Sequence, residues 1–379
     1  MPENEAPLTY YATFIPGLQD CIAEVVKERL PEAVIQKLLE GAIIFETPCT
    51  YDRLNFFCFN NIFLVSGIVE YASEKRIRDS GPMSSKNAAP LESHMKKVIA
   101  PGGGFAGSSG KNDPVISLNN KKIRSFRIIC SIENRLVPVN EKIKQETERF
   151  IAAQSGMAVN RSLPDTEFWF LYRSEGFSVF MKRLTKHGSF DKALHPGELP
   201  PPLAWMLCRL SNPKNTDTVI DPFCGYGSIP AERIKRFPLE KMYALDRDSA
   251  ALEQARKKIA GPGSAGKAGA MAKSCHIEKA DITSAPAICG EASADAIITD
   301  PPWGIYEKTD VPLQEFYDEM MKIFARLLKP KGTLVLLTAK KEELLLAAEK
   351  ANAFTLNRPI PILLSGKKAA IFVFNFSSS

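Results

Sequence analysis

The sequence lacks the residue clusters that build metal sites and disulfide frameworks. Only four of its 379 residues are histidines and eight are cysteines, and no two cysteines form a CxxC pair. Clustered cysteines and histidines are the usual ligands of structural zinc, and small secreted domains depend on paired cysteines. We therefore expect no metal site and reduced cysteines in the core, as in a protein of the reducing cytoplasm.

Long apolar segments are also missing. No apolar run approaches the ~20 residues that a membrane-spanning helix needs. The first residues, Met-Pro-Glu-Asn-Glu-Ala, are acidic and lack the basic and then apolar order of a secretory signal peptide. We therefore expect a cytoplasmic protein that does not associate with membranes.

Length and composition are those of ordinary globular domains. The chain is 45% hydrophobic and 24% charged, which is typical of packed domains, and 379 residues suit two or three of them. The net charge of +6 is mild. It permits nucleic-acid binding without requiring it, because many enzymes are as basic.

Alternating strand and helix patterns divide the chain into four parts. Residues 1–75 look like a small α+β module, and residues 76–185 hold a second module behind a Gly-rich segment at 101–110. A polar linker, 186–202, ends in three prolines. From residue 203 to 379 strands and helices alternate in the doubly wound manner. This pattern predicts an α/β, Rossmann-like domain with a mostly parallel sheet, preceded by two α+β modules.

Hydrophobic periodicity places the individual elements. Strands are expected at 8–14, 43–45, 62–69, 125–131, 167–172, 178–184, 218–221, 242–246, 276–279, 296–299, 333–338 and 369–376. Helices are expected at 18–29, 51–58, 91–99, 140–155, 203–210, 229–236, 249–259, 313–328 and 341–351. A second Gly-rich segment, at 261–270, has the composition of an exposed insertion.

A glycine turn follows the predicted strand that ends at Asp221. Gly225 and Gly227 allow the backbone to pass close to a ligand, and the helix behind them directs its amino-terminal amides toward it. Asp246 ends the next strand, where a carboxylate can bind both ribose hydroxyls of a nucleoside. Pro230 stands where a dinucleotide fingerprint has its third glycine, which argues against a pyrophosphate cofactor. A purely structural turn is the alternative interpretation.

Asp281 follows the third strand of the same domain. There its side chain can accept a hydrogen bond from an adenine amino group, and the alternative role is that of a helix N-cap. A nucleoside site without pyrophosphate recognition favours S-adenosylmethionine over NAD.

A second turn, Asp300-Pro301-Pro302-Trp303, follows another apolar strand, so Asp300 is expected at the same sheet edge as Asp221. The prolines fix two successive φ angles and offer carbonyls without competing N–H donors. If the Asp300 carboxylate and the Pro301 carbonyl each accept one N–H of an exocyclic amine, the nitrogen lone pair points at a methyl donor. Trp303 can stack on the base, a contact of ~1–3 kcal/mol. A stiff surface turn is the alternative for this motif in isolation.

Basic residues gather around the middle of the N-terminal half, opposed by few acidic ones. Such a segment can follow phosphates, although a solvated linker accounts for the charge equally well. The basic residues are Lys75, Arg76, Arg78, Lys86, Lys96, Lys97, Lys111, Lys121, Lys122, Arg124 and Arg127.

These motifs carry a resemblance to a known family. The turn Asp-Pro-Phe-Cys-Gly-Tyr-Gly-Ser, residues 221–228, resembles the cofactor loop of class I methyltransferases that methylate amino groups of nucleic acids. The span 125–184 looks like a THUMP RNA-binding domain behind a ferredoxin-like module. The segment Leu-His-Pro-Gly-Glu-Leu-Pro-Pro-Pro-Leu-Ala, residues 194–204, is similar to the junction in THUMP-containing N2-guanine tRNA methyltransferases.

The resemblance implies an S-adenosylmethionine-dependent enzyme, with a monomer favoured, that methylates N2 of a guanine in tRNA held by the THUMP part. It assigns cofactor binding to Asp221, Phe223, Gly225, Gly227, Asp246 and Asp281, and catalysis to Asp300, Pro301, Pro302 and Trp303. Tyrosine or phenylalanine is commoner than tryptophan at the last position. The motifs leave open an adenine-N6 methyltransferase acting on RNA or DNA, a glutamine side-chain methyltransferase, and a non-catalytic RNA-binding protein with a relic methyltransferase fold.

Overall fold

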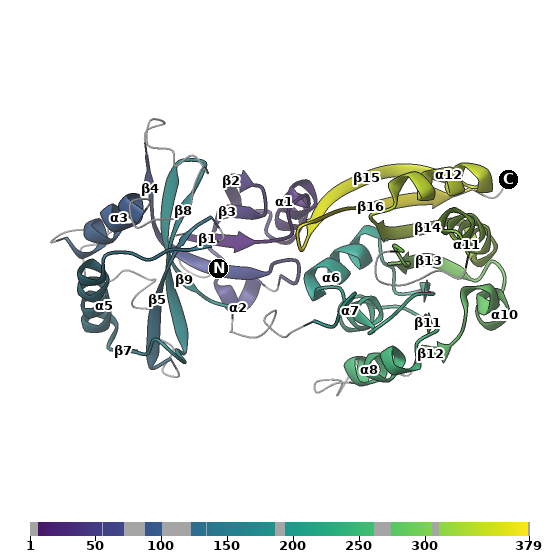
Figure 1. The fold of residues 1–379 in the computed structure, drawn as a ribbon, viewed down its shortest axis with the longest axis horizontal. Coiled ribbons are helices and arrows are strands. Elements are labelled where there is room, and N and C mark those ends of the chain that lie inside the picture. The colour runs from purple at the N-terminus through teal and green to yellow at the C-terminus, as the bar shows by residue number, and fades with distance from the viewer. Residues whose placement is uncertain are drawn as a thin grey trace. The chain divides into compact units, whose positions relative to one another are not determined.

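The computed structural model describes residues 7–54, 56–71, 88–100, 123–133, 135–185, 194–260, 274–304 and 311–377. The chain forms two compact units (Figure 1). The first consists of Met1–Thr13, Ala23–Asn55 and Asn61–Ser189, and the second of Phe14–Ile22, Phe56–Asn60 and Phe190–Ser379. Both predicted Gly-rich insertions, 101–110 and 261–270, and the first part of the predicted linker lie outside the described residues.

One nine-stranded sheet forms the centre of the first unit. Its strands are β1 (Leu8–Thr13), β2 (Val34–Leu39), β3 (Ala42–Thr47), β4 (Asn61–Glu70), β5 (Ser125–Ile132), β6 (Arg135–Leu136), β7 (Ala158–Val159), β8 (Thr166–Arg173) and β9 (Phe177–Arg183). The order is β2-β3-β1-β4-β9-β8-β5-β6, with β7 beside β5. Because β4 pairs with β9, the two predicted N-terminal modules share one continuous sheet.

Among the described residues four helices accompany this sheet, and one of them, α5, has clear capping residues at both ends. The helices are α2 (Tyr51–Leu54), α3 (Ala89–Ile99), α5 (Glu141–Ser155) and the larger part of α1 (Gln19–Arg29), whose residues up to Ile22 are assigned to the second unit. Asn140 caps α5 by accepting hydrogen bonds from the amides of Lys142 (3.0 Å) and Ile143 (3.3 Å), and Gly156 ends the helix at a φ of 70°. Both are standard helix-end signals, which explains why the predicted bounds of α5 are confirmed.

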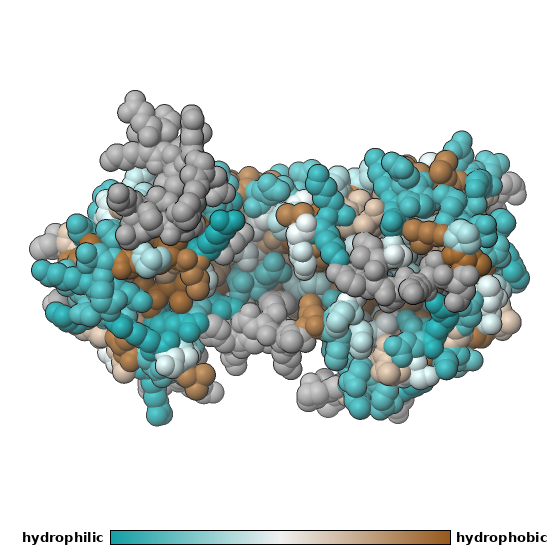
Figure 2. Space-filling model, in the orientation of Figure 1, coloured by the Kyte–Doolittle hydropathy of each residue, from teal (hydrophilic) through white to brown (hydrophobic). Residues whose placement is uncertain are grey.

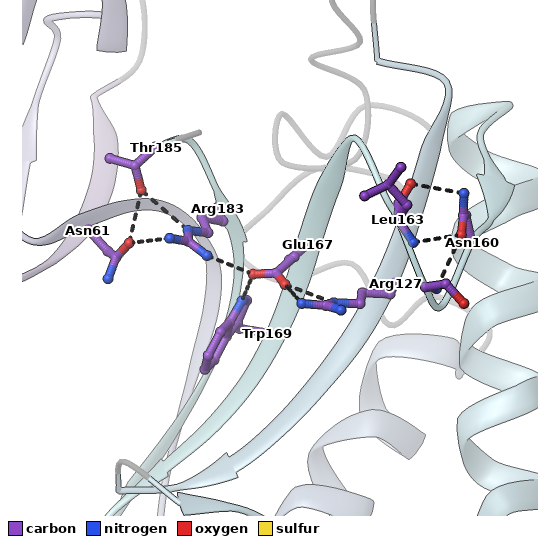
Figure 3. Close-up of polar contacts among 9 residues, drawn as sticks. Asn61, Arg127, Asn160, Leu163, Glu167, Trp169, Arg183 and Thr185 are labelled. Atoms are coloured by element: carbon purple, nitrogen blue, oxygen red, sulfur yellow. Dashed lines mark hydrogen bonds and ion pairs between the residues drawn. The ribbon is translucent and has the colours of Figure 1, made fainter. Parts of the chain in front are cut away.

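A polar network crosses four neighbouring strands of this sheet (Figure 3). The Glu167 side chain on β8 is 1% exposed and accepts hydrogen bonds from Arg127 Nε on β5 (2.8 Å) and Trp169 Nε1 (3.0 Å). It also forms an ion pair with Arg183 on β9 (3.2 Å), and Arg183 donates to Asn61 Oδ1 on β4 (2.7 Å). The network therefore ties β5, β8, β9 and β4 together at one end of these strands.

The second unit is built on a seven-stranded sheet of order β12-β11-β10-β13-β14-β16-β15. Its strands are β10 (Thr218–Asp221), β11 (Lys241–Asp246), β12 (Cys275–Lys279), β13 (Ala294–Thr299), β14 (Leu328–Thr338), β15 (Phe354–Leu364) and β16 (Lys367–Phe376). The strands from β12 to β14 are parallel, and β16 is antiparallel to both of its neighbours. The strand order reverses between β10 and β13. Ligands bind at such a reversal in open α/β sheets, outside the carboxyl ends of the strands.

Helices cover both faces of this sheet (Figure 1). They are α6 (Pro201–Leu210), α7 (Ser228–Arg236), α8 (Ser249–Ala260), α10 (Ala285–Cys289), α11 (Leu313–Leu327) and α12 (Lys341–Ala351). On one face, Ile220 and Ile297 of the central strands pack with Phe324 of α11 and Leu344 of α12. On the other face, Leu252 of α8 packs against Ala244 of β11. The α/β doubly wound architecture predicted from the sequence is thereby confirmed.

Several elements were not predicted, among them the helix α10 and the two-residue strands β6 and β7, and one helix was predicted too long. The strand β15 was not predicted, because Pro359 and Pro361 interrupt its pattern; it lies at the sheet edge, where a missing N–H leaves no neighbour unpaired. The edge strand β2 was also missed. The helix expected at 51–58 ends at Leu54, and Cys58 and Phe59 beyond it are buried. A helix through this segment would distribute its successive apolar residues over all sides.

The face drawn in Figure 2 is largely hydrophilic with separate hydrophobic areas. Among the described residues, the exposed large hydrophobic side chains come from several elements and loops, with Leu163 at 83% and Leu136 at 69% the most exposed. Single exposed apolar residues are normal on protein surfaces and define no docking site. The described helices include none that is long and apolar enough to cross a membrane.

Candidate functional site

Asp221 ends β10 at the strand-order reversal and is 1% exposed. Its Oδ1 accepts hydrogen bonds from the Thr299 hydroxyl (2.8 Å) and the Phe223 amide (3.3 Å). Its Oδ2 is buried and has no hydrogen-bond partner among the residues that the structure describes. Burial raises the pKa of Asp221 to about 8; the two hydrogen bonds oppose this shift, and the negative charge of Asp246 adds to it. When Asp221 is ionised, this buried oxygen can accept a hydrogen bond from a ligand.

Asp246 ends the neighbouring strand β11 and contacts the glycine turn directly. Its Oδ2 accepts a hydrogen bond from the Gly225 amide (2.7 Å), and its Oδ1 accepts one from the Asp248 amide (2.8 Å). The Cys224 amide donates to the Leu245 carbonyl at 2.9 Å. These contacts hold the glycine turn against the end of β11, so the predicted ribose-binding carboxylate also shapes the turn.

The two glycines of the turn have different roles. Both have positive φ angles, 48° at Gly225 and 77° at Gly227. A Cβ placed on Gly225 would find no described heavy atom within 4 Å, so this side of the turn is open to a ligand. A Cβ on Gly227 would lie 2.7 Å from the Ala255 Cβ of α8. Gly227 therefore allows close packing of the turn on a helix, and the approach of its backbone to a ligand stays a prediction.

Gly227→Ala is expected to destabilise the protein more than Gly225→Ala, by ~1–3 kcal/mol. Both changes place a side chain in the left-handed region, at a cost of ~1–2 kcal/mol, but Gly227→Ala also forces Ala255 aside. Urea unfolding of the two variants measures the difference. Equal unfolding free energies would show that α8 moves away without cost.

The second predicted turn follows β13 directly, beside the first. Because β13 is the parallel neighbour of β10, Asp300 lies next to the carboxyl end of the strand that carries Asp221. The hydroxyl of Thr299, which ends β13, donates to Asp221 and joins the two turns. On the α11 side, the Tyr317 hydroxyl lies 3.4 Å from the Pro302 carbonyl oxygen and 2.7 Å from the Thr338 hydroxyl.

The Trp303 side chain makes a contact that the sequence did not predict. Its Nε1–H donates a hydrogen bond to Asp300 Oδ1 at 2.9 Å. Tyrosine or phenylalanine at this position has no ring N–H, so this contact is specific to tryptophan. The indole therefore restrains the Asp300 carboxylate, in addition to the stacking role expected of it.

Asp281 and Phe223 are the remaining residues that were predicted to bind the cofactor. Asp281 caps the 3₁₀ turn Ile282–Ser284 by accepting a hydrogen bond from the Thr283 amide (3.0 Å), which is the alternative role considered for it. Its other oxygen lies 3.9 Å from Arg247 NH1, with both side chains about half exposed. The centroid of the Phe223 ring lies 5.7 Å from the centroid of the Phe316 ring of α11. Adenine recognition by Asp281 stays a prediction.

Sequence reasoning missed Thr299 and Tyr317. Thr299 is fully buried and stands immediately before the Asp-Pro-Pro-Trp turn, so its position at a strand end was a usable signal. Tyr317 lies in the middle of α11, and nothing local relates it to Pro302. The described residues contain no group of three or more His, Cys, Asp or Glu side chains that could hold a metal ion.

The strand order and the two adjacent turns at its reversal define a class I methyltransferase fold. Residues 190–357 match the family UPF0020, described as the RMKL-like methyltransferase domain. This match begins before the predicted domain start at residue 203, at the residue where the last segment of the second unit also begins.

Known proteins that are similar to this chain include two curated methyltransferases and one protein of solved structure. The tRNA (guanine(6)-N(2))-methyltransferase THUMP3 of Mus musculus is 31% identical over 152 residues, which are 39% of this chain and 30% of that protein. The U6 snRNA (guanine-N(2))-methyltransferase THUMPD2 of Bos taurus is 24% identical over 279 residues, 70% of this chain and 52% of that protein. The crystal structure of TrmN from Thermus thermophilus has a TM-score of 0.71 at 20% identity, covering 97% of this chain and 99% of that one.

These comparisons confirm the methyltransferase fold over the C-terminal half. The similar segments span only about half or less of the two curated relatives, 52% and 30% of their lengths. The TrmN likeness extends over nearly the whole chain, so the similarity of fold is not limited to the C-terminal half.

Proposed function

We propose that this protein transfers a methyl group from S-adenosylmethionine to the N2 amine of a guanine in RNA, with tRNA as the substrate. The observation that carries this proposal is the Thr299–Asp221 hydrogen bond, which places the cofactor turn and the Asp-Pro-Pro-Trp turn side by side at the strand-order reversal. Relatives named as guanine-N2 methyltransferases of tRNA and U6 snRNA support the choice of base and of RNA.

The residues around Asp221 fit a cationic nucleoside cofactor. A bound ammonium group would favour the ionised form of Asp221 and donate a hydrogen bond to its buried Oδ2, and the open side of Gly225 leaves room for close approach. Asp246 would accept hydrogen bonds from ribose hydroxyls through the lone pairs that its two backbone contacts leave. When bound, S-adenosylmethionine supplies an electrophilic methyl group on its sulfonium sulfur.

The Asp-Pro-Pro-Trp turn would then position the amine. Asp300 and the Pro301 carbonyl would each accept one of its N–H groups, while Trp303 stacks on the base and restrains the Asp300 carboxylate through Nε1. Most of the rate gain would come from alignment, and the negative charge of Asp300 would stabilise the positive charge that develops on nitrogen. A strong base is unnecessary because the methylated aryl ammonium is acidic.

We also propose that the first unit is the RNA-holding part, in keeping with its predicted THUMP-like pattern at 76–185 and the basic residues of its α3 and neighbouring segments. Lys96 and Lys97 are exposed on α3 and could contact phosphates.

Nucleoside mass spectrometry tests the function directly. Bulk tRNA and a U6 snRNA transcript would each be incubated with the full chain and isotope-labelled S-adenosylmethionine, then digested to nucleosides. We expect labelled N2-methylguanosine from tRNA. Labelled N6-methyladenosine would favour the adenine alternative, and a lack of both S-adenosylhomocysteine binding and labelled product would indicate a relic fold.

Asp221→Asn is expected to remove a pH-dependent cost of folding. The folded protein keeps the Asp221 proton up to a pKa of about 8, whereas the unfolded chain loses it near the ordinary value of 3.8. Between these values the unfolded state binds fewer protons, so Asp221 makes the protein less stable as the pH rises from ~4 to ~8. The asparagine variant should therefore gain stability relative to the wild type between pH 5 and pH 8.

Urea unfolding at pH 5 and at pH 8 measures the stability that Asp221→Asn gains over the wild type. Asp20→Asn, on the exposed first turn of α1, is the control. Asp221→Asn should also weaken binding of S-adenosylhomocysteine, because an amide cannot ionise to pair with the ammonium group of the ligand and directs an N–H group toward it. A stability difference that is independent of pH would contradict the ionisation argument.

A further inference from the structure

The segment that leads into α6 forms a tight turn beside the cofactor turn. In His195-Pro196-Gly197-Glu198 the Glu198 amide donates to the His195 carbonyl at 2.9 Å, and Gly197 has a φ of 82°. Proline at the second position and glycine at the third are the residues that a type II turn favours. The Glu198 carboxylate accepts a further hydrogen bond from the His195 amide (3.0 Å), which braces the turn internally.

This turn, residues 195–198, contacts the glycine turn directly through His195 and indirectly, by way of Lys258, through Glu198. The His195 ring stacks on the Tyr226 ring, with centroids 4.3 Å apart and planes 8° apart. The Glu198 carboxylate forms an ion pair with Lys258 of α8, and Lys258 Nζ donates to the Ser228 hydroxyl at 3.2 Å. Burial opposes ionisation of Glu198, but Lys258 and the His195 amide outweigh it and keep its pKa below the ordinary value.

Tyr226 lies in the part of the glycine turn where the neighbouring residue types give the backbone the most conformational freedom. Tyr226 stands between two glycines with positive φ angles, and glycine loses more conformational freedom on ordering than any other residue. Hydrogen bonds to Asp246 and Leu245 hold Cys224 and Gly225. The Tyr226 side chain is only partly buried, and its ring stacks on that of His195.

We propose that His195 and Glu198 are positioning residues for the methyl donor. They hold Tyr226 and Ser228, and through them keep the open side of Gly225 in the conformation that binds the cofactor. Ordering the turn before binding raises affinity, because the ligand then does not bear the cost of ordering it. The nature of the ligand rests on the proposed function, whereas the ordering of the turn does not.

Hydrogen exchange of the full chain without cofactor tests the ordering. His195→Ala should speed amide exchange in peptides that cover residues 222–230, and His195→Phe, which retains a stacking ring, should restore exchange close to the wild type. Exchange in β16 serves as the internal control for global unfolding. Unchanged exchange at 222–230 in His195→Ala would overturn the proposal, and so would equal acceleration in β16.

Calorimetric titration with S-adenosylhomocysteine tests the consequence for binding. Loss of the ring stack in His195→Ala should weaken affinity roughly three- to tenfold, the size expected of one aromatic pair. His195→Phe should recover the affinity, and His195→Ala should have little further effect in a Tyr226→Ala background. A full effect in that background would refute action through Tyr226. Absence of binding by the wild type would instead refute the proposed function and leave the exchange result valid.

Should His195→Ala fail to fold, Glu198→Gln provides the same test. This change keeps the size of the side chain and leaves the His195 ring in place, but weakens the ion pair with Lys258. It should speed exchange at 222–230 and weaken S-adenosylhomocysteine binding in the same direction. Wild-type values in both measurements would count against the proposal.

Discussion

Replacing Asp300 with alanine is expected to lower methyl transfer at least ~10²-fold while the affinity for S-adenosylhomocysteine stays near that of the wild type. Asp300 follows β13 and is separate from the contacts that hold the glycine turn, which come from Asp246 and Leu245. Its carboxylate would act only on the amine, by accepting an N–H and by stabilising the positive charge on nitrogen. The effect should therefore appear in turnover and not in cofactor binding.

Asp300→Asn separates charge from hydrogen bonding. The asparagine oxygen can still accept the Trp303 Nε1–H, so the indole should keep its position while the negative charge is lost. Asp295→Asn is the matched control, because Asp295 lies at the amino end of the same strand and accepts the Thr218 amide there (2.8 Å). Single-turnover rates on tRNA measure all three variants. Wild-type turnover in Asp300→Ala would remove this residue from the mechanism.

Replacing Glu167 with alanine is expected to lower the free energy of unfolding by ~3–5 kcal/mol. The change removes the acceptor of Arg127, Arg183 and the Trp169 N–H, and the Arg183 side chain is only 9% exposed. Removing one partner of a buried ion pair leaves the other charge in a poorly solvated position, which costs more than the pair contributes.

Glu167→Gln should be less damaging, because it keeps one oxygen acceptor and the shape of the side chain. Glu146→Ala on α5 is the control for loss of a glutamate elsewhere in the unit. Urea unfolding can be followed by tryptophan fluorescence, to which Trp169 of the network contributes together with Trp205 and Trp303. A loss below ~1 kcal/mol in Glu167→Ala would contradict the expected cost.

Elements with strong local signals could be predicted from the sequence. The helix α5 has an asparagine cap and a terminating glycine, and the parallel strands of the second unit are short apolar runs between turns. The edge strands β15 and β2 lack these signals, because one side of such a strand makes no ladder contacts and tolerates residues such as Pro359, although the edge strand β12 was predicted. This is the physical reason that β15 and β2 were missed.

The candidate site was likewise predictable from the sequence only in part. Sequence motifs identified Asp221, Asp246 and Asp300 as strand-end carboxylates, because a parallel sheet brings the carboxyl ends of its strands to one edge. The motifs did not distinguish Gly225 from Gly227, because that difference depends on Ala255, a residue of another helix. The Trp303 contact with Asp300 was also beyond the motif, since side-chain direction in a turn depends on its packing.

The sequence by itself determined the residue types at the strand ends and the class of ligand that they suit. It could do so because two properties are local: the backbone conformation of proline and glycine turns, and the hydrogen-bonding capacity of each side chain. Only the tertiary structure decided that Thr299 meets Asp221 across 78 positions of the chain, and that His195 stacks on Tyr226. Such contacts depend on which strands are neighbours and on how loops pack, and both are set by burial of the whole core. For this protein, local chemistry supplied the functional groups and long-range packing assembled them into one site.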